Sequence, residues 1–178
     1  MFKLLKIIRG AGEATEKYPF APFPVSPNFR GKPEHSPAQC IACAACVTAC
    51  PPNALTMQTN TAEGKRTWQL NIGRCIFCGR CEEVCPTRAI KLSQEFELAV
   101  GSKADLLQRA DFTLTSCYCC GSAFAPAKEV DYALALLAQG ALSAEQAEAM
   151  RPHLETCPEC KRKQALASIE PAQALMRG

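Results

Sequence analysis

Aromatic residues are scarce in this chain, and long apolar runs are missing from it. Aromatic side chains make up 7% of the 178 residues and tryptophan occurs once, although hydrophobic residues reach 48%. Apolar material is adequate for a core but thinly spread, which suits one domain or two small ones. No run approaches the roughly 18 to 20 apolar residues that span a bilayer. We therefore expect a soluble or peripheral protein, with any membrane link through partners or an amphipathic segment.

Catalytic and nucleotide-binding signatures are also missing. The sequence has no phosphate-binding glycine loop, no dinucleotide fingerprint after a strand and no paired-histidine zinc-protease motif. It also lacks a plausible nucleophile with its base. We therefore expect a protein that is not itself an enzyme.

Cysteine, in contrast, is abundant. Thirteen cysteines occur in a chain without a recognisable cleavable signal peptide. This combination indicates metal ligation in a reducing compartment rather than a disulfide framework. The cytoplasm is the expected location.

Two copies of one cysteine motif lie 35 residues apart. Both have the spacing C-x2-C-x2-C-x3-C-P, and the offset also carries Ala54-Leu55 onto Ala89-Ile90, so a whole supersecondary unit is duplicated. This spacing is typical of bacterial 4Fe-4S proteins, in which the fourth cysteine serves the other cluster. Zinc or disulfides are the alternative, and two complete copies in register argue against it.

The spacing predicts which cysteines share a cluster. The first three of each motif lie on a tight loop around three corners of a cubane, whereas the fourth lies about one helical turn further and points to the neighbouring site. The first predicted cluster is held by Cys40, Cys43, Cys46 and Cys85, and the second by Cys75, Cys78, Cys81 and Cys50. With every corner occupied by thiolate, the available chemistry is one-electron transfer. Small loop residues let backbone N–H groups approach the cluster sulfurs; these are Ala42, Ala44, Ala45 and Gly79.

A further metal site is predicted in the tail. Two C-x-x-C knuckles, with 36 residues between them, leave room for a helical hairpin that brings the pairs together. The predicted ligands are Cys117, Cys120, Cys157 and Cys160. Tetrathiolate geometry suits zinc or a single rubredoxin-like iron. Cys119 is interpreted as a spare thiol, although it could replace Cys117, and free thiols in a helical tail are the other alternative.

The formal charge changes sign once these sites are counted. Twenty Lys and Arg against seventeen Asp and Glu give +3, with every cysteine neutral. Each tetrathiolate site with its metal adds about −2, so three sites bring the total to roughly −3. Basic residues are also scattered, and we expect no nucleic-acid partner.

The N-terminal region predicts a docking element. Residues 2–9 form an amphipathic helix that is too short to be stable alone. Residues 11–39 hold six of the thirteen prolines and must run extended. They also carry aromatic side chains that a solvated linker does not need, namely Tyr18, Phe20, Phe23 and Phe29. We expect both parts to press against a partner or interface; a terminus that folds back and a flexible linker are the alternatives. His35 is expected to be an ordinary polar residue rather than a ligand.

The remaining patterns predict an α+β fold. Strands are expected at 54–58, 67–71 and 89–93, and helices at 103–109, at 128–139 and from a capping box at Ser143 toward 150 or 151. The predicted regions are an N-terminal helix and docking arm (1–33), a two-cluster bacterial ferredoxin domain (34–95) and a helical extension with two C-x-x-C knuckles (96–178).

These residues carry a family resemblance. The segment from Arg74 to Pro86, with Phe29-Arg30-Gly31-Lys32 upstream, resembles the two-cluster ferredoxin-type subunit of respiratory complex I and of membrane-bound hydrogenases. The tail knuckles depart from the complex I subunit and are similar to the iron-sulfur subunit family of formate hydrogenlyase (subunit 6) and hydrogenase-4 (component H). The likeness covers essentially the whole chain.

The resemblance implies an electron-transfer subunit of a membrane-bound group 4 nickel-iron hydrogenase complex, on the cytoplasmic face of the membrane. Implied partners are the hydrogenase small and large subunits and a multi-cluster ferredoxin-like subunit linked to formate dehydrogenase, with the membrane arm reached indirectly. The Arg30-Gly31 match implies that the arm docks on the hydrogenase core. The alternatives are a complex I-like NADH/quinone oxidoreductase subunit, disfavoured by the tail, and a zinc-ribbon interaction module with structural clusters. Formate hydrogenlyase and hydrogenase-4 assemblies are not separated by the resemblance.

Overall fold

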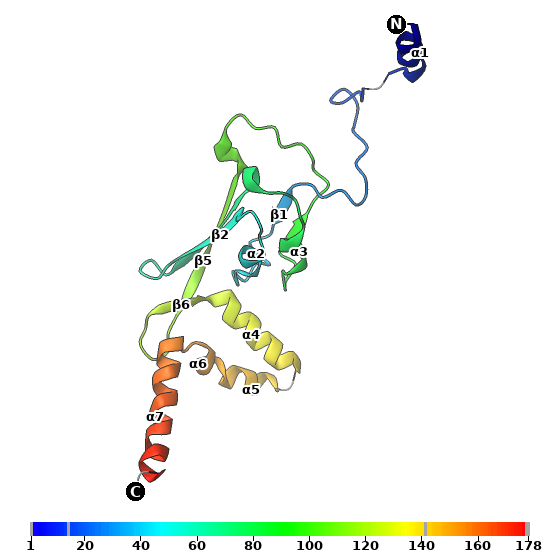
Figure 1. Ribbon diagram of the computed structural model, residues 1–178. Coiled ribbons are helices and arrows are strands. Elements are labelled where there is room, and N and C mark those ends of the chain that lie inside the picture. Colours follow the sequence, from blue (N-terminus) through cyan, green and yellow to red (C-terminus); the bar gives the residue numbers. More distant parts are fainter. Residues whose placement is uncertain (1, 14, 141, 177–178) are drawn as a thin grey trace.

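A computed structural model describes residues 2–13, 15–140 and 142–176, and its elements are mixed α and β (Figure 1). Residues 1, 14, 141, 177 and 178 of the two outer predicted regions lie outside this description. The elements in chain order are α1 (Phe2–Ala11), β1 (Pro33–His35), α2 (Ala45–Thr48), β2 (Leu55–Asn60), β3 (Lys65–Asn71), a 3₁₀ turn (Ile72–Arg74), α3 (Arg80–Glu83), β4 (Ile90–Leu92), a second 3₁₀ turn (Lys103–Leu106), β5 (Leu107–Ser116), β6 (Ala123–Pro126), α4 (Ala127–Gly140), α5 (Ala144–Ala149), α6 (Arg151–Leu154) and α7 (Pro158–Met176).

The strands form two antiparallel sheets. One pairs β1 with β4, and the other has the order β2-β3-β5-β6. The β2–β3 hairpin turns through Gly64 at φ +63°, where the Asn60 side-chain oxygen accepts the N–H groups of Ala62 and Glu63. The strands predicted at 54–58, 67–71 and 89–93 are confirmed with small shifts at their ends.

The helix predicted at 103–109 is wrong. A capping box joins Ser102 to Asp105, but the turn that it starts ends at Leu106, and the ten-residue strand β5 follows. Phe112 and Leu114 are buried in alternation with more exposed residues, and β5 pairs with β3 from Leu107 to Thr113. The segment therefore begins with a capped helical turn, but pairing with β3 replaces the continuation of the helix by a strand. Strand β5 begins after residue 95, where the ferredoxin domain was predicted to end. It nevertheless pairs with β3 and so extends a sheet of that domain.

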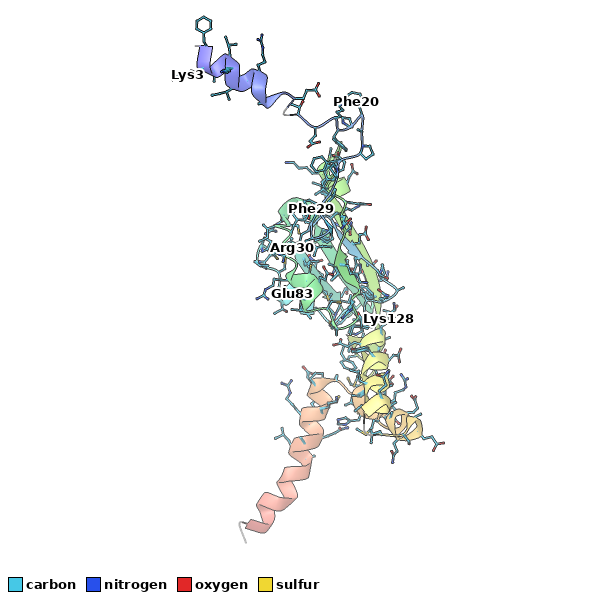
Figure 2. The ribbon with its side chains drawn as sticks, turned by 90° about the vertical axis from the view of Figure 1, so that its right-hand side faces the viewer. Lys3, Phe20, Phe29, Arg30, Glu83 and Lys128 are labelled. Atoms are coloured by element: carbon cyan, nitrogen blue, oxygen red, sulfur yellow. The ribbon has the colours of Figure 1, made fainter. Side chains whose placement is uncertain are left out.

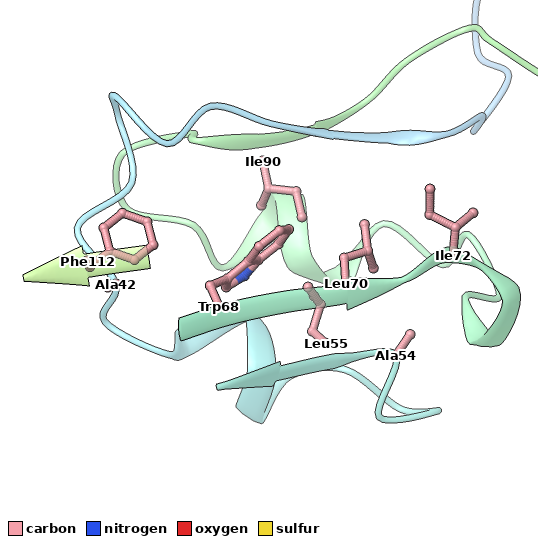
Figure 3. Close-up of a cluster of buried hydrophobic side chains, with 8 residues drawn as sticks. All are labelled: Ala42, Ala54, Leu55, Trp68, Leu70, Ile72, Ile90 and Phe112. Carbon is pink, nitrogen blue, oxygen red and sulfur yellow. The ribbon is translucent and has the colours of Figure 1, made fainter. Parts of the chain in front are cut away.

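Eight buried apolar residues form the core beside the β2–β3 hairpin (Figure 3). They are Ala42, Ala54, Leu55, Trp68, Leu70, Ile72, Ile90 and Phe112. The single tryptophan is 1% exposed, and burying a large apolar side chain contributes about 1.5–3 kcal/mol. Six of the eight motif cysteines pack against this cluster. The core thereby fixes the positions of the cysteine loops.

Helices α4, α5 and α6 of the C-terminal region pack on one another. Val130 and Leu134 of α4 are buried, as is Ala147 of α5. The helix predicted at 128–139 is confirmed, and the capping box is present because Ser143 and Gln146 exchange backbone-to-side-chain hydrogen bonds of 3.2 and 2.9 Å. Pro152 follows α5 and lies in the first turn of the separate helix α6. Strands β1 and β6 and helix α7 were not predicted.

The N-terminal arm leaves the ferredoxin domain and carries α1 at its far end (Figures 1 and 2). The predicted helix is confirmed and continues through Gly10 to Ala11, and none of its ten described residues is buried. Closer to the domain, the arm runs along the segment after β4. The Gly31 N–H donates to the Ser93 carbonyl at 2.8 Å, and the Tyr18 and Phe23 rings lie 5.3 Å from Phe96. Part of the predicted docking arm therefore packs on its own chain.

Candidate iron-sulfur and tetracysteine sites

The eight motif cysteines line two cavities beside the core. These cavities contain about 340 and 360 Å³ of empty space, solvent at their mouths included. The first is lined by Cys40, Cys43, Cys46 and Cys85, and the second by Cys75, Cys78, Cys81 and Cys50. Each cavity thus combines three cysteines of one motif with the fourth cysteine of the other, which is the grouping that the spacing predicts.

The backbone of the two cysteine loops repeats with the same 35-residue offset. Three pairs of equivalent residues adopt the left-handed region of backbone conformation: Ala42 and Phe77, Ala44 and Gly79, and Asn53 and Arg88. All of them except Gly79 do so although they carry a side chain. Each such non-glycine residue costs roughly 1–2 kcal/mol. The Ala42 N–H donates to Cys40 Sγ and the Phe77 N–H to Cys75 Sγ, both at 3.4 Å. Loops of this kind present backbone N–H groups to an anion. The negatively charged sulfurs of a cluster would accept hydrogen bonds from such groups.

Burial makes four of the eight cavity thiols harder to ionise in the absence of a metal. Burial raises the pKa of Cys40, Cys46 and Cys75, and it raises that of Cys81 to about 12. For Cys85 burial acts in the same direction, but hydrogen bonds from the Thr87 hydroxyl and nearby N–H groups outweigh it and lower the pKa. A coordinating thiol is deprotonated by the charge of its metal. This donor set therefore fits a cationic centre rather than free thiolates.

Two buried nitrogen atoms next to the first cavity also fit an iron-sulfur group. Among the described residues, Trp68 Nε1 and His35 Nε2 are buried without a hydrogen-bond partner. The two rings stack with centroids 3.8 Å apart, and His35 lines the first cavity. Burial raises the pKa of Cys46, whereas the approaching Trp68 N–H lowers it without forming a hydrogen bond of ordinary geometry. An unsatisfied buried donor costs about 1–3 kcal/mol, and cluster sulfurs would supply the missing acceptor.

Burial also holds His35 in its neutral form. It lowers the pKa of this imidazole to about 4, so one ring nitrogen carries a proton at neutral pH. The sequence predicted an ordinary polar residue, and the chain fold places it at the cavity wall through strand β1. No local pattern signals that position, because the contact depends on the pairing of β1 with β4.

An arginine supports each cysteine loop. Arg66 Nη1 donates to the Ala42 carbonyl at 3.1 Å in the first loop, and Arg30 Nη1 donates to the Cys78 carbonyl at 3.0 Å in the second. Beside Arg30, a Cβ atom at Gly31 would lie only 2.3 Å from the Glu95 carbonyl oxygen. The Arg30-Gly31 pair, which the resemblance assigned to docking, therefore has a role within this chain.

The four tail cysteines converge on one point. Their sulfur atoms all lie within 4.8 Å of one another, and the Cys120 and Cys157 sulfurs are 3.8 Å apart. A tetrahedron with metal-sulfur bonds of about 2.3 Å has sulfur-sulfur edges of about 3.8 Å. One pair lies in the turn between β5 and β6, where Gly121 has φ +72°, and the other at the start of α7. The geometry suits a single tetrahedral metal ion.

Hydrogen bonds lower the pKa of two of the four converging tail thiols, Cys117 and Cys120. The Cys157 N–H donates to Cys117 Sγ at 3.2 Å and is the main reason why the pKa of Cys117 falls to about 6. The backbone and hydroxyl of Ser122 lower the pKa of Cys120, while the contact with Cys157 raises that of Cys160. Cys119 is exposed, and its sulfur accepts from Gln164 Nε2 at 3.3 Å. Cys117, rather than Cys119, joins the converging group.

Comparisons with known proteins also separate the region of the eight motif cysteines from the C-terminal region. A family model described as "4Fe-4S dicluster domain" matches residues 39–89, and one described as "Putative zinc-finger" matches residues 128–161. Formate hydrogenlyase subunit 6 of Escherichia coli (strain K12) is 57% identical over 166 residues, which cover 93% of this chain and 91% of that protein.

The chain belongs to the formate hydrogenlyase subunit 6 family. The family recognised from the cysteine motifs and the tail is thereby confirmed. A solved chain from the membrane-bound sulfane sulfur reductase, an archaeal respiratory membrane complex, is 28% identical with a TM-score of 0.43. That likeness covers 57% of this chain and 53% of the other, so the overlap spans about half of each.

For this family member, the 4Fe-4S ferredoxin domain and a C-terminal cysteine cluster are established features of an α/β chain. Sequence reasoning did not find Trp68, His35 or Arg66 as neighbours of the first cavity. Trp68 is the single tryptophan of the chain and lies between polar residues of a predicted strand, which could have indicated that its side chain is buried. Nothing local marked Arg66.

Proposed function

We propose that this chain relays electrons through two 4Fe-4S clusters within a membrane-bound group 4 nickel-iron hydrogenase complex of the formate hydrogenlyase type. The observation that carries the proposal is the pair of cavities, each lined by four cysteines drawn from both motifs. Clusters with four thiolate ligands supply one-electron transfer and offer no open iron to a substrate. The chain is accordingly proposed to be non-catalytic.

The proposed ligands follow the side-chain grouping. Cys40, Cys43, Cys46 and Cys85 hold the first cluster; Cys75, Cys78, Cys81 and Cys50 hold the second; Cys117, Cys120, Cys157 and Cys160 hold zinc or a rubredoxin-like iron. Helix α2 carries Cys46 at one cavity and leads directly to Cys50 at the other, and α3 does the same with Cys81 and Cys85. Two short helical segments therefore connect the two centres, which favours transfer between them.

The N-terminal arm is proposed to attach the relay to its partners. Phe2 is 89% and Phe20 97% exposed, an arrangement that an isolated surface does not favour. Proposed partners are the hydrogenase small and large subunits and a multi-cluster ferredoxin-like subunit linked to formate dehydrogenase. In the part of the chain that the structure describes, no helix has the length and apolarity needed to cross a bilayer. We propose a peripheral position on the inner face of the cell membrane through these partners, and we retain the three regions 1–33, 34–95 and 96–178 as the working division.

The test uses the full chain purified anaerobically. Two clusters require about eight iron and eight labile sulfide per chain, beyond the tail metal. Reduction with dithionite should give the paramagnetic signals of two interacting clusters. Clusters that resist reduction would leave only a structural role and would overturn the relay. Subunits that co-purify after detergent extraction identify the complex, and a set without a nickel-iron hydrogenase would contradict the proposed assembly.

Single-cysteine variants test the crossed ligands. Cys50→Ala should damage the cluster of Cys75, Cys78 and Cys81, and Cys85→Ala the cluster of Cys40, Cys43 and Cys46. Cys119→Ala is the matched control and should leave both spectra unchanged. Loss of the cluster nearest in sequence would show that the crossing is wrong.

A further inference from the structure

Lys128, labelled in Figure 2, lies in the first turn of α4. It contacts the segment just before the first cysteine loop, residues 40–50. Its Nζ donates to the carbonyl oxygens of Pro37 at 2.8 Å and Ala38 at 3.1 Å. The same ammonium group lies 5.8 Å from the centre of the Phe112 ring. Two carbonyls and an aromatic face therefore hold a positive charge beside the segment that leads into Cys40.

Glu129 makes a second contact from the same turn. Its carboxylate lies 3.9 Å from Arg66 Nη1, and the Arg66 side chain is only 18% exposed. Arg66 in turn donates to the carbonyl of Ala42, inside the first cysteine loop. The start of α4 thus reaches this loop on both sides of Cys40, directly through Lys128 and indirectly through Arg66.

These contacts are specific to the first loop. Among the described residues, no hydrogen bond or ion pair joins residues 117–164 to the second loop, 75–85. The second loop is supported instead by Arg30 of the arm. The two cavities therefore have different external supports.

The support of the first loop is also connected to the tail cysteines. Strand β6 and α4 follow directly after Cys120 and Gly121, and α5 and α6 return the chain to Cys157. The four tail cysteines would hold a metal ion at both ends of this segment and so close it into a loop. Such a closure would restrain the helix start that carries Lys128 and Glu129.

We propose that the start of α4 is a clamp through which the tetracysteine site positions the first cysteine loop and tunes its cluster, while leaving the second cluster unaffected. The inference rests on the proposed function. In it, Lys128 is a positioning residue that holds the backbone at 37–38 and places a positive charge next to Cys40. Because reduction adds negative charge to a cluster, a nearby cation favours the reduced form.

Potentiometric EPR titration of the full chain tests the clamp. Lys128→Met keeps the length of the side chain but removes the charge and both hydrogen bonds. It should lower the midpoint potential of the first cluster, which corresponds to a change of roughly two- to fivefold in its reduction equilibrium. The second cluster should not shift. Lys103→Met, which removes the same charge from an exposed turn that lines neither cavity, is the matched control.

A second variant separates the clamp from a simple charge effect. Cys157→Ser should speed loss of iron from the first cluster to a chelator, with the second cluster retained. If Lys128→Met or Cys157→Ser affects both clusters equally, or neither, the clamp is refuted while the relay stands. Wild-type protein without reducible clusters overturns the proposed function, and the clamp with it. Cys50→Ala and Cys85→Ala assign the two signals.

Discussion

Replacing Trp68 by phenylalanine tests whether its indole N–H serves the first cluster. The tryptophan is 1% exposed, and its N–H approaches Cys46 while having no partner among the described residues. Phenylalanine preserves an aromatic surface for the stacked His35 ring. The change therefore removes the donor and part of the buried volume.

The two losses act on two different measurements. Lost burial should lower the free energy of unfolding by about 1–3 kcal/mol. A hydrogen bond to a charged acceptor contributes about 1.5–3 kcal/mol, and the cluster sulfurs become more negative on reduction. If about one third of this contribution distinguishes the two redox states, the first cluster loses about 20–40 mV, since 1.4 kcal/mol corresponds to about 59 mV for one electron.

The assay is EPR-monitored redox titration combined with thermal unfolding, both anaerobic. Ile72→Val is the control, because Ile72 belongs to the same buried cluster, carries no polar side-chain hydrogen and lines neither cavity. Both variants should be less stable, but only Trp68→Phe should lower the potential of the first cluster. Equal shifts in the two variants would mean that packing alone sets the potential, and a shift of the second cluster would refute the assigned direction of the N–H.

Three further outcomes follow from the arm and the tail. Deleting residues 1–29 leaves Arg30 and Gly31 in place, so both clusters should assemble. Affinity for the membrane complex should fall more than tenfold if two aromatic contacts of about 1.5–3 kcal/mol each are lost. A membrane fraction that retains the normal amount of the truncated chain and evolves hydrogen normally would show that the arm is only a tether. Gly31→Ala should lower the free energy of unfolding by about 1–3 kcal/mol, because the added Cβ would meet the Glu95 carbonyl. Gly101→Ala is the control and should leave stability unchanged, because its Cβ would meet open space. Thermal unfolding compares the two variants. Elemental analysis should find one zinc or one additional iron per chain, and Cys160→Ser should abolish it; metal confined to the cubane iron and sulfide would remove the tail site.

The grouping of the cysteines could be predicted because it depends on short-range geometry. A spacing of C-x2-C-x2-C-x3-C allows few loop conformations, and its repetition after 35 residues implies that both copies fold alike. The matched left-handed residues at Ala42 and Phe77 bear this out in the backbone. Phe77 also shows a limit, because small side chains were expected at such positions. Phe77 has φ 53° and donates its N–H to Cys75 Sγ, as Ala42 does to Cys40 Sγ, so the loop geometry takes precedence over side-chain size.

Strand β5 illustrates what local patterns could not predict. The Ser102 and Asp105 pair is a genuine helix-start signal, and the residues that follow are compatible with a helix. The outcome is decided by β3, whose edge becomes fully paired once β5 lies along it. Strands β1 and β6 were missed for a related reason, because each is short, carries a proline and is defined by its partner strand.

The supports of the two cysteine loops come from opposite ends of the chain. Lys128 reaches Pro37 across a sequence separation of 91 residues, and Arg30 reaches Cys78 across 48. A duplicated motif on its own would give two equivalent sites. The arm supports one loop and the tail region supports the other, so additions outside the repeat make the two sites different. If the arm docks on a partner, its attachment would act through Arg30 on the second cavity, whereas the proposed tail metal would act through Lys128 on the first. In the proposed relay, a difference between the two centres would therefore originate outside the ferredoxin repeat.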